Sequence, residues 1–297
     1  MEPHWDDMKV FLAVARAESL SGAGRKLKLD PATVGRRITR LEQAVEAPLF
    51  RKSPQGYALT PAGERLLAHG EQVEQAMRAG MDAISGSTDR LSGQIRIGAP
   101  DGCATYLLPQ VCLSIARENP DLDIQIVAQP RVVNLSRREA DVAITVSRPT
   151  AGQLLVQKIT DYHLHLAASQ DYLAEHAIRG REDLRGLPMV GYIPDMIFDA
   201  ELDYLHELGV ERVALASNSV PVQLRMTEGG QGLCVAHDFA LPSHPSLRKV
   251  LTDEIALTRA FYLVRHQSDQ KSERLSRFSA LLVERLKAEV YHLEGAT

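Results

Sequence analysis

The residues of this 297-residue chain best suited to contact a partner are three arginines near its N-terminus, Arg36, Arg37 and Arg40. A guanidinium group can donate two hydrogen bonds to the edge of a guanine and can neutralise a phosphate, so a cluster of arginines on one helix face is typical of DNA binding. Apolar residues recur between the arginines at helical spacing, which predicts that the arginines project outward from a helix that begins at Pro31. The cluster indicates double-stranded DNA as a partner.

The surrounding residues predict a helix-turn-helix that would position these arginines. The first helix is expected over Trp5 to Ala17, and a second runs through Leu27 from a serine cap at position 19 or 21. Asp30 can cap the third helix, and Pro31 fits its first position, where the missing N–H costs nothing. The third helix therefore has the pattern of a recognition helix, whose N-terminal half meets base edges.

A wing and a long helix are predicted next. Residues 49–60 read as two short strands around a turn at 53–56, the pattern of a wing that reaches DNA backbone or minor groove. A long helical pattern starts at Pro61 and carries one apolar stripe, which is typical of a helix that pairs with a copy of itself; the alternative is packing on its own chain. We expect a DNA-binding domain over 1–62 and a linker and dimerisation helix over 63–90.

Charge is divided unevenly along the chain. The formal net charge is −4, which alone would argue against nucleic acid as a partner. Residues 16–52 hold nine basic groups against four acids, a local excess of +5 that leaves the remainder near −9. A basic module on an acidic body suits a protein that neutralises phosphates at one end and does something else at the other.

Length and composition limit the remaining choices. A chain of 297 residues predicts two or three domains, and an apolar share of 44% with 24% charged residues is ordinary for a globular protein. The chain has no run of eighteen apolar residues, and its acidic opening differs from a secretory signal, so we expect it in the cytoplasm. Cys103, Cys112 and Cys234 are too few and too scattered for a disulfide framework.

From Ser92 onward short β patterns alternate with helices, which predicts parallel sheets with crossover helices. Strands are expected at 94–98, 122–127, 141–146, 164–168, 188–192, 212–216, 233–236 and 261–266. Helices are expected near 106–118, 132–139, 200–208, 220–229 and 271–293. A chain that leaves one α/β unit, builds another and returns gives two lobes on a pair of hinge strands: lobe I over 91–160 and 267–297, and lobe II over 161–266.

Several segments carry a family resemblance in order and spacing. They read FLAVARAESLSGAGRKLKL, ATVGRRITRLEQAV, PLFRK and LTPAGERLL, followed beyond position 90 by GQIRIGAPDGCATYLLPQVCLSIARENPDLDIQIV and LSRREADVAITV. Together they resemble LysR-type transcriptional regulators over the whole chain. The resemblance implies a winged helix-turn-helix and a periplasmic-binding-protein-like (type II) α/β effector domain over 91–297. It also implies a homodimer, or a homotetramer by family habit, that reads an inverted repeat under the control of a small-molecule effector and that can meet RNA polymerase.

The recognition helix departs from the family pattern. The family commonly opens this helix with Ser-Gln, the glutamine being a base reader, whereas Asp30 and Pro31 stand here, and Gly35 replaces the usual serine. Base reading should therefore rest on Thr33, Arg36 and Arg37. The full set of expected DNA contacts is Ser21, Thr33, Arg36, Arg37, Arg40, Arg51 and Lys52.

The effector site follows from the expected strands and helices. Ligands of open α/β folds bind at the carboxyl ends of strands and at helix N-termini, and the family places its effectors between the lobes. The residues expected there are Pro100, Asp101, Gly102, Cys103, Thr105, Ser147, Arg148, Tyr192, Asn218, Ser219 and Gly230.

Asp101 stands where many family members have serine or threonine. A carboxylate beside a helix N-terminus competes with an anionic ligand. Two hypotheses follow. Either the effector carries hydroxyl, amino or cationic groups that face Asp101, or Arg148 neutralises the carboxylate.

Rival functions find less support in the sequence. An enzyme would need a nucleophile–base pair or a cofactor fingerprint, and the chain has no GxSxG motif, P-loop lysine or clustered metal ligands, so we expect neither catalysis nor a cofactor. For an architectural DNA-binding protein, the large acidic body would be superfluous. Cys103 with Cys234 leaves open a cysteine-based redox-sensing regulator of the same fold, and His163 with His165 leaves open a metal site that lacks an evident third ligand.

Overall fold

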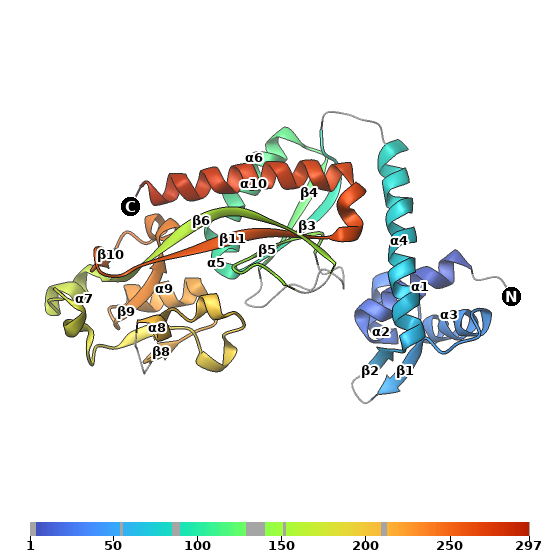
Figure 1. Cartoon of the computed structure of the whole chain (residues 1–297), viewed down its shortest axis with the longest axis horizontal. Coiled ribbons are helices and arrows are strands. Elements are labelled where there is room, and N and C mark those ends of the chain that lie inside the picture. The colour runs from blue at the N-terminus through green and yellow to red at the C-terminus, as the bar shows by residue number, and fades with distance from the viewer. Residues whose placement is uncertain are drawn as a thin grey trace. The chain divides into compact units, whose positions relative to one another are not determined.

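A computed structural model describes residues 4–53, 56–84, 90–128, 140–150, 153–208 and 213–296. The chain divides into two compact units, an N-terminal unit that ends at residue 87 and a C-terminal unit that makes up most of the rest. Figure 1 labels the helices and strands of each unit. Within the described part of the chain, no helix is long and apolar enough to span a membrane.

The N-terminal unit is a winged helix-turn-helix followed by a long helix. Its elements are α1 (Trp5–Ala17), α2 (Leu20–Leu27), α3 (Pro31–Ala44), β1 (Phe50–Ser53), β2 (Gly56–Leu59) and α4 (Pro61–Ile84). The inner faces of the helices meet in one core, in which Phe11, Val34 and Leu41 are fully buried. Phe50 of the wing joins this core, its ring centroid lying 5.3 Å from that of Phe11.

Local capping fixes the ends of these helices. The Ser19 hydroxyl accepts a hydrogen bond from the Gly22 amide at 3.0 Å, which selects Ser19 from the two candidate caps of α2. Asp30 caps α3 by accepting from the Ala32 amide at 2.6 Å, with Pro31 at the first helical position. Both α2 and α3 therefore start where the sequence predicts.

The wing is anchored to the turn after α1. The Tyr57 amide donates to the Glu18 carbonyl at 2.8 Å. Gly56 has φ of 131°, and a Cβ there would lie 2.3 Å from the same carbonyl oxygen. Only glycine fits this close approach.

The C-terminal unit is an α/β body around a nine-stranded sheet. Its strands are β3 (Gly93–Ala99), β4 (Leu122–Ala128), β5 (Val142–Thr145), β6 (Leu154–Ser169), β7 (Met189–Gly191), β8 (Leu215–Ala216), β9 (Leu233–His237), β10 (Leu247–Val250) and β11 (Ala256–His266). Its α-helices are α5 (Asp101–Tyr106), α6 (Leu108–Glu118), α7 (Gln170–Glu175), α8 (Tyr204–Glu207), α9 (Val220–Glu228) and α10 (Glu273–Glu294). Short 3₁₀ turns include η2 (Pro194–Met196), η3 (Ala200–Leu202) and η4 (Asp238–Ser243).

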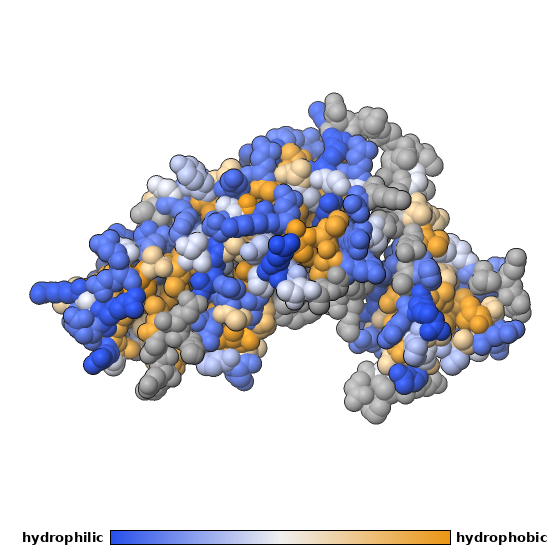
Figure 2. Space-filling model, in the orientation of Figure 1, coloured by the Kyte–Doolittle hydropathy of each residue, from blue (hydrophilic) through white to orange (hydrophobic). Residues whose placement is uncertain are grey.

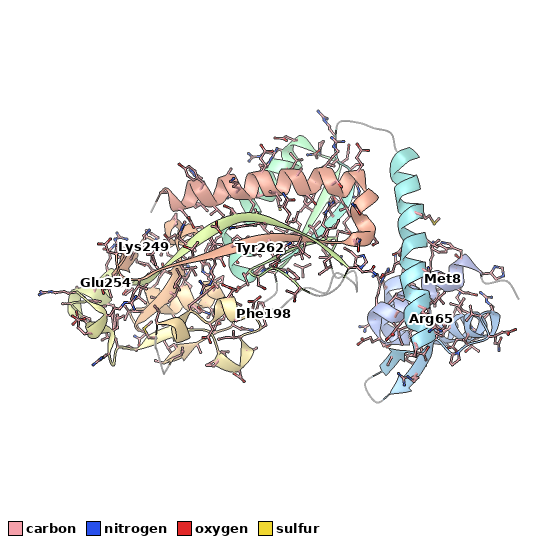
Figure 3. All side chains as sticks on the ribbon, in the orientation of Figure 1. Met8, Arg65, Phe198, Lys249, Glu254 and Tyr262 are labelled. Atoms are coloured by element: carbon pink, nitrogen blue, oxygen red, sulfur yellow. The ribbon has the colours of Figure 1, made fainter. Side chains whose placement is uncertain are left out.

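Two long antiparallel strands, β6 and β11, join the lobes. The strand order is β4-β3-β5-β11-β6-β9-β7-β8, with β10 on β6, so the parallel strands of lobe I and lobe II lie on opposite sides of this pair. The register of β11 on β6 shifts between Phe261 and Tyr262, a bulge midway along the pair. Tyr262 marks this position in Figure 3, whereas Lys249 and Glu254 lie at the β10 end.

Some predicted elements differ from the structure. The strand expected at 164–168 is the end of a longer strand, the 16-residue β6. The residues before position 164 include polar ones, yet they also belong to the strand because they pair with β11. The helix expected at 200–208 is broken into η3 and α8. Of the strand expected at 212–216, the described residues 213–216 form a strand only in β8. The helix expected at 132–139 lies outside the described residues. The closing helix is confirmed as α10, which runs along the long strands in Figure 1.

Hydrophilic residues cover most of the visible face of the C-terminal unit, with smaller apolar areas between them (Figure 2). The interior of the C-terminal unit contains one large hydrophobic core. Its largest side chains include Tyr162, Phe239, Phe261 and Phe278, which are almost fully buried. Tyr162 and Phe261 stack across β6 and β11 with ring centroids 4.2 Å apart. The strand pair that links the lobes thus contributes large side chains to this core.

Candidate DNA-binding surface and effector site

The outer face of α3 carries the predicted base readers. Val34, Ile38 and Leu41 of α3 are buried, whereas Arg36 is exposed and Thr33 and Arg37 are partly exposed. Arg36 is exposed, and its Nη2 donates to the Thr33 hydroxyl at 3.0 Å. This hydrogen bond holds a guanidinium over the first turns of α3, the part of a recognition helix that meets base edges.

Arg40 is bound within the unit. Its Nε donates to Oδ2 of Asp7 in α1 at 2.6 Å, and its Nη2 donates to the other carboxylate oxygen. Asp7 is only 1% exposed, whereas 45% of the Arg40 side chain is accessible. The hydrogen bonds from Arg40 raise the pKa of its guanidinium further. The pair therefore ties α3 to α1 and leaves part of the guanidinium accessible.

The remaining predicted DNA contacts lie outside α3. Ser21 is exposed in the first turn of α2, and Arg51 is exposed on β1, opposite Ala58 in the wing. Lys52 follows Arg51 on β1, and its side chain lies outside the described residues.

Glu42 links α3 to the wing, because its carboxylate accepts the amides of Leu49 and Phe50 at 2.7 and 3.2 Å. Sequence reasoning missed this contact. The signal available was a glutamate at the end of a helix, which is too common to single out.

Asp101 lies where α5 of lobe I meets α9 of lobe II. It opens α5 directly after β3, and its Oδ2 accepts the Val220 amide of α9 at 2.9 Å. Burial raises the pKa of Asp101, while hydrogen bonds from the Ser219 side chain and the Val220 amide oppose that rise. The structure thus brings Asp101 and Ser219 together, with Pro100 and Gly102 on either side of Asp101.

Two further polar contacts cross the lobe junction. The Ser147 hydroxyl, after β5, donates to the carboxylate of Asp199, which caps η3 in lobe II. The Tyr106 hydroxyl at the end of α5 lies 2.8 Å from Nε2 of His244. Sequence reasoning missed Asp199 and His244, although Asp199 precedes a helical turn as a capping residue would.

A cavity of about 440 Å³ opens in lobe II beside this junction. Its lining is Val190, Gly191, Tyr192, Pro194, Ile197, Leu202, Asp203, Tyr204, Leu205, Val213, Gln223 and Val235. Burial raises the pKa of Tyr192 and Tyr204 well above the usual range, so both phenols remain neutral. The lining combines apolar side chains with polar ones, among them Gln223 and one carboxylate, Asp203, and carries no lysine, arginine or histidine among the described residues.

The other predicted effector residues are spread more widely. Asn218 precedes the N-terminus of α9 together with Ser219, whereas Gly230 follows the C-terminus of that helix with φ of 73°. Arg148 and Thr105 are exposed. The glycine-rich segment after α9 begins at the end of that helix, with Gly229 as its C-cap.

The three cysteines are buried thiols. Burial raises the pKa of Cys112 and of Cys234 to about 11, and raises that of Cys103 further. Since the thiolate is the form that reacts with peroxide, these environments oppose redox chemistry at neutral pH.

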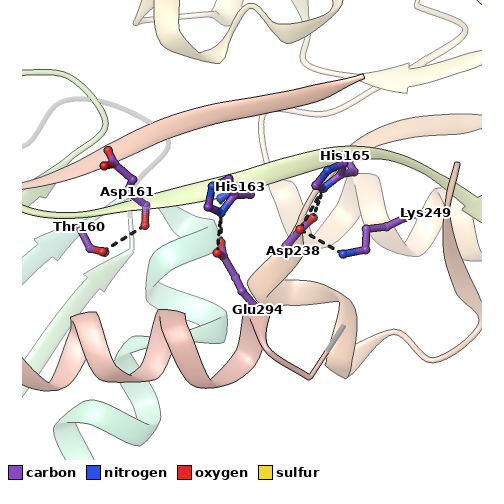
Figure 4. A network of polar contacts seen from close by, with 7 residues as sticks. All are labelled: Thr160, Asp161, His163, His165, Asp238, Lys249 and Glu294. Atoms are coloured by element: carbon purple, nitrogen blue, oxygen red, sulfur yellow. Dashed lines mark hydrogen bonds and ion pairs between the residues drawn. The ribbon is translucent and has the colours of Figure 1, made fainter. Parts of the chain in front are cut away.

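His163 and His165 each have a separate carboxylate partner (Figure 4). His163 Nδ1 lies 2.8 Å from Oε2 of Glu294, and His165 Nδ1 lies 2.9 Å from Oδ1 of Asp238, which Lys249 also approaches at 3.2 Å. In the described ranges, no three histidine, cysteine or acidic side chains group as metal ligands. These contacts connect β6 with α10, η4 and β10.

Comparison with known families agrees with this architecture. Residues 5–64 match the profile of the bacterial regulatory helix-turn-helix protein, lysR family, and residues 88–287 match the LysR substrate binding domain. The fold and the two surfaces define a helix-turn-helix regulator with a ligand-binding body. Because the second profile alone matches more than half of the 297 residues, the chain belongs to the LysR family of transcriptional regulators.

Individual relatives are distant. The HTH-type transcriptional regulator DgdR of Burkholderia cepacia is 28% identical over 250 residues, which are 80% of this chain and 79% of DgdR. DmlR of Escherichia coli strain K12 is 27% identical over 187 residues, 63% of this chain, and the match spans only 61% of DmlR.

Solved structures share the fold over nearly the whole chain. A full-length OxyR variant from Pseudomonas aeruginosa superposes with a TM-score of 0.71 at 16% identity, covering 96% of this chain and 98% of that one. CrgA from Neisseria meningitidis gives a TM-score of 0.58 at 21% identity, covering 95% and 98%. The predicted fold class, a winged helix-turn-helix with a linker helix and a periplasmic-binding-protein-like body, is confirmed.

Proposed function

We propose that the chain is a sequence-specific regulator that acts in the cytoplasm on an inverted-repeat operator, and that a small molecule bound between lobe I and lobe II controls its DNA binding or its activation of transcription. The observation that carries the proposal is the lobe junction, where Asp101, Ser147 and Tyr106 of lobe I contact polar groups of lobe II. A ligand that alters these contacts shifts the balance between lobe arrangements.

On the DNA, Thr33, Arg36 and Arg37 read bases, and Ser21, Arg40, Arg51 and Lys52 contact phosphates. Arg36 and Arg51 are exposed, which supports these roles. Arg40 uses two of its five N–H groups on Asp7, which leaves the others for a phosphate. In this proposal α1 and α3 act as one rigid body.

The subunits associate through α4 as a dimer, and two dimers form a homotetramer. Val73 and Met77 support the pairing, because each is about half exposed on a helix with a polar surface, at 49% and 51%. A dimer places two recognition helices on successive half-sites of one operator. Contact with RNA polymerase would then be made from the same assembly.

The effector has hydroxyl, amino or cationic groups and an apolar body. Asp101 and Asp199 at the junction and Asp203 in the cavity are carboxylates that accept such groups. The apolar walls, among them Val190 and Leu205, suit the rest of the molecule. The alternative, a cysteine-based redox regulator of the same fold, is disfavoured by the buried, neutral thiols.

Thermal shift of the full-length chain against paired amines and carboxylates of equal size tests the effector class. We expect hydroxylated or amino compounds to raise the melting temperature, and we expect the same compounds to change a DNase footprint on genomic DNA. A footprint that no ligand changes, or stabilisation by carboxylates alone, would contradict the proposal. A response only to peroxide would favour the redox alternative.

A further inference from the structure

The N-terminus of α9 is an anion-binding position by its geometry. The first amides of a helix have no partner inside it and carry partial positive charge. In α9 the second residue, Pro221, has no N–H, and the Val220 amide is directed out of the helix toward lobe I. Anions bind such helix ends through the free amides.

The residue that usually caps such a helix does not cap α9. Ser219 occupies the N-cap position, but its side chain makes no capping hydrogen bond within the helix. Instead the Val220 amide donates to Oδ2 of the Asp101 carboxylate at 2.9 Å. The cap of α9 therefore comes from a residue 119 positions away, in the other lobe.

The same carboxylate also serves α5. Asp101 is the first residue of α5, where its carboxylate opposes the partial positive charge of the helix end. Pro100, at the N-cap of α5, has no capping side chain. One charge thus lies at the N-terminus of α5 and caps the N-terminus of α9.

The two helices lie next to each other at this point. A Cβ built on Gly102 would lie 3.5 Å from the Val220 side chain, which is ordinary van der Waals contact. Any group on a ligand that approached the Val220 amide would have to displace the Asp101 carboxylate first.

We propose that Asp101 is a specificity-determining residue, a tethered anion that caps α9 from lobe I and denies this position to carboxylate ligands. The Val220 amide at the start of α9 is then hydrogen-bonded without a bound anion from solution. The exclusion of carboxylates deepens the effector function proposed above and rests on it, whereas the capping rests on the hydrogen bonds alone.

Hydrogen exchange at the Val220 amide of the full-length chain tests the proposal. The measurement uses mass spectrometry with fragmentation to single residues, without DNA or effector, in sodium formate and in sodium chloride of equal ionic strength. In Asp101→Ala we expect Val220 to exchange on the order of tenfold faster than in the unaltered chain. Formate should restore most of the protection, because it fills the position that the side chain leaves.

Two variants serve as controls. Asp101→Asn keeps an acceptor oxygen and fills the same space, so Val220 should stay largely protected and formate should have no effect. Asp195→Ala removes an exposed carboxylate on η2 and should leave Val220 unchanged with either salt. Asp101→Ser replaces Asp101→Ala if the alanine chain loses its far-UV circular dichroism.

The proposal is overturned if Val220 exchanges equally fast in the unaltered chain and in Asp101→Ala or Asp101→Ser. It is also overturned if formate protects the unaltered chain as strongly as the variant. Neither result depends on whether a metabolite controls DNA binding, so failure here is distinct from failure of the regulator function.

Discussion

Replacing Arg16 should loosen the attachment of α4 to the helix-turn-helix. Arg16 of α1 donates to both carboxylate oxygens of Glu74 at 3.2 and 2.7 Å, and its Nη2 lies 3.6 Å from Oε1 of Glu71. The side chains of Arg16 and Glu71 are 10% and 9% exposed, and that of Glu74 is 26% exposed. The group is thus largely shielded from water, and Arg16→Ala removes the nearest cation from the buried Glu71 carboxylate.

The size of the effect follows from this burial. Removing one partner of a fully buried ion pair costs roughly 3–5 kcal/mol, and exposed pairs contribute about 0–1 kcal/mol. Since Glu74 keeps access to water, we expect a loss of about 2 kcal/mol. With a urea slope of about 1–3 kcal/mol per molar, the unfolding midpoint of the N-terminal unit should fall by roughly 1 M.

The single tryptophan makes the measurement specific to this unit. Trp5 is the only tryptophan of the chain and opens α1, so its fluorescence reports the N-terminal unit within the full-length protein. Arg65→Ala is the matched control, because Arg65 is an exposed arginine on α4 and should change the midpoint little. Equal shifts for Arg16→Ala and Arg65→Ala would refute the reasoning.

Further expectations concern the wing, the DNA contacts and the core of lobe II. Gly56→Ala should lower the free energy of unfolding detected by Trp5 by roughly 1–3 kcal/mol, because the new Cβ would lie 2.3 Å from a carbonyl oxygen. An unchanged free energy of unfolding would show that the wing adjusts without cost. Arg51→Ala should weaken binding to all DNA and lower the salt slope by about 0.9, whereas Arg37→Ala should cost about 1–3 kcal/mol of base discrimination; equal losses on operator and random DNA would remove Arg37 from the readers. Burial lowers the pKa of His237 from 6.5 to about 4. As the pH falls, this imidazole is therefore protonated in the unfolded chain before it is protonated in the folded chain. The free energy of unfolding should fall by about 3 kcal/mol between pH 6.5 and pH 4. Urea unfolding of His237→Asn, followed by circular dichroism, should lack that part of the pH dependence.

Local signals were sufficient for the N-terminal unit. Asp30 and Pro31 predict the start of α3, because a capping side chain and the fixed φ of proline favour a helix start at their own position. The inward positions of α3, Val34 and Leu41, follow from periodicity alone. The partner of Arg40 could not be predicted in this way, because Asp7 lies 33 positions earlier and meets it only after α1 packs on α3.

The C-terminal unit shows the same limit more strongly. The polar residues within β6 resemble a strand boundary, yet antiparallel pairing with β11 extends the strand over 16 residues. Asp101 was recognised as unusual from its position, but its role as the cap of α9 depends on a contact that spans 119 positions. The partners of Asp199 and His244 could not be predicted, because Ser147 and Tyr106 are distant in sequence and meet them only after the two lobes have folded together.

A footprint of the full-length chain on genomic DNA, titrated with compounds that raise its melting temperature, tests the central claim most directly. We predict one protected inverted repeat whose extent or affinity changes with a compound that binds the C-terminal unit, and we predict loss of that protection in Arg37→Ala. A footprint that stays the same at saturating ligand, or protection spread evenly over all DNA, would contradict ligand-controlled, sequence-specific binding.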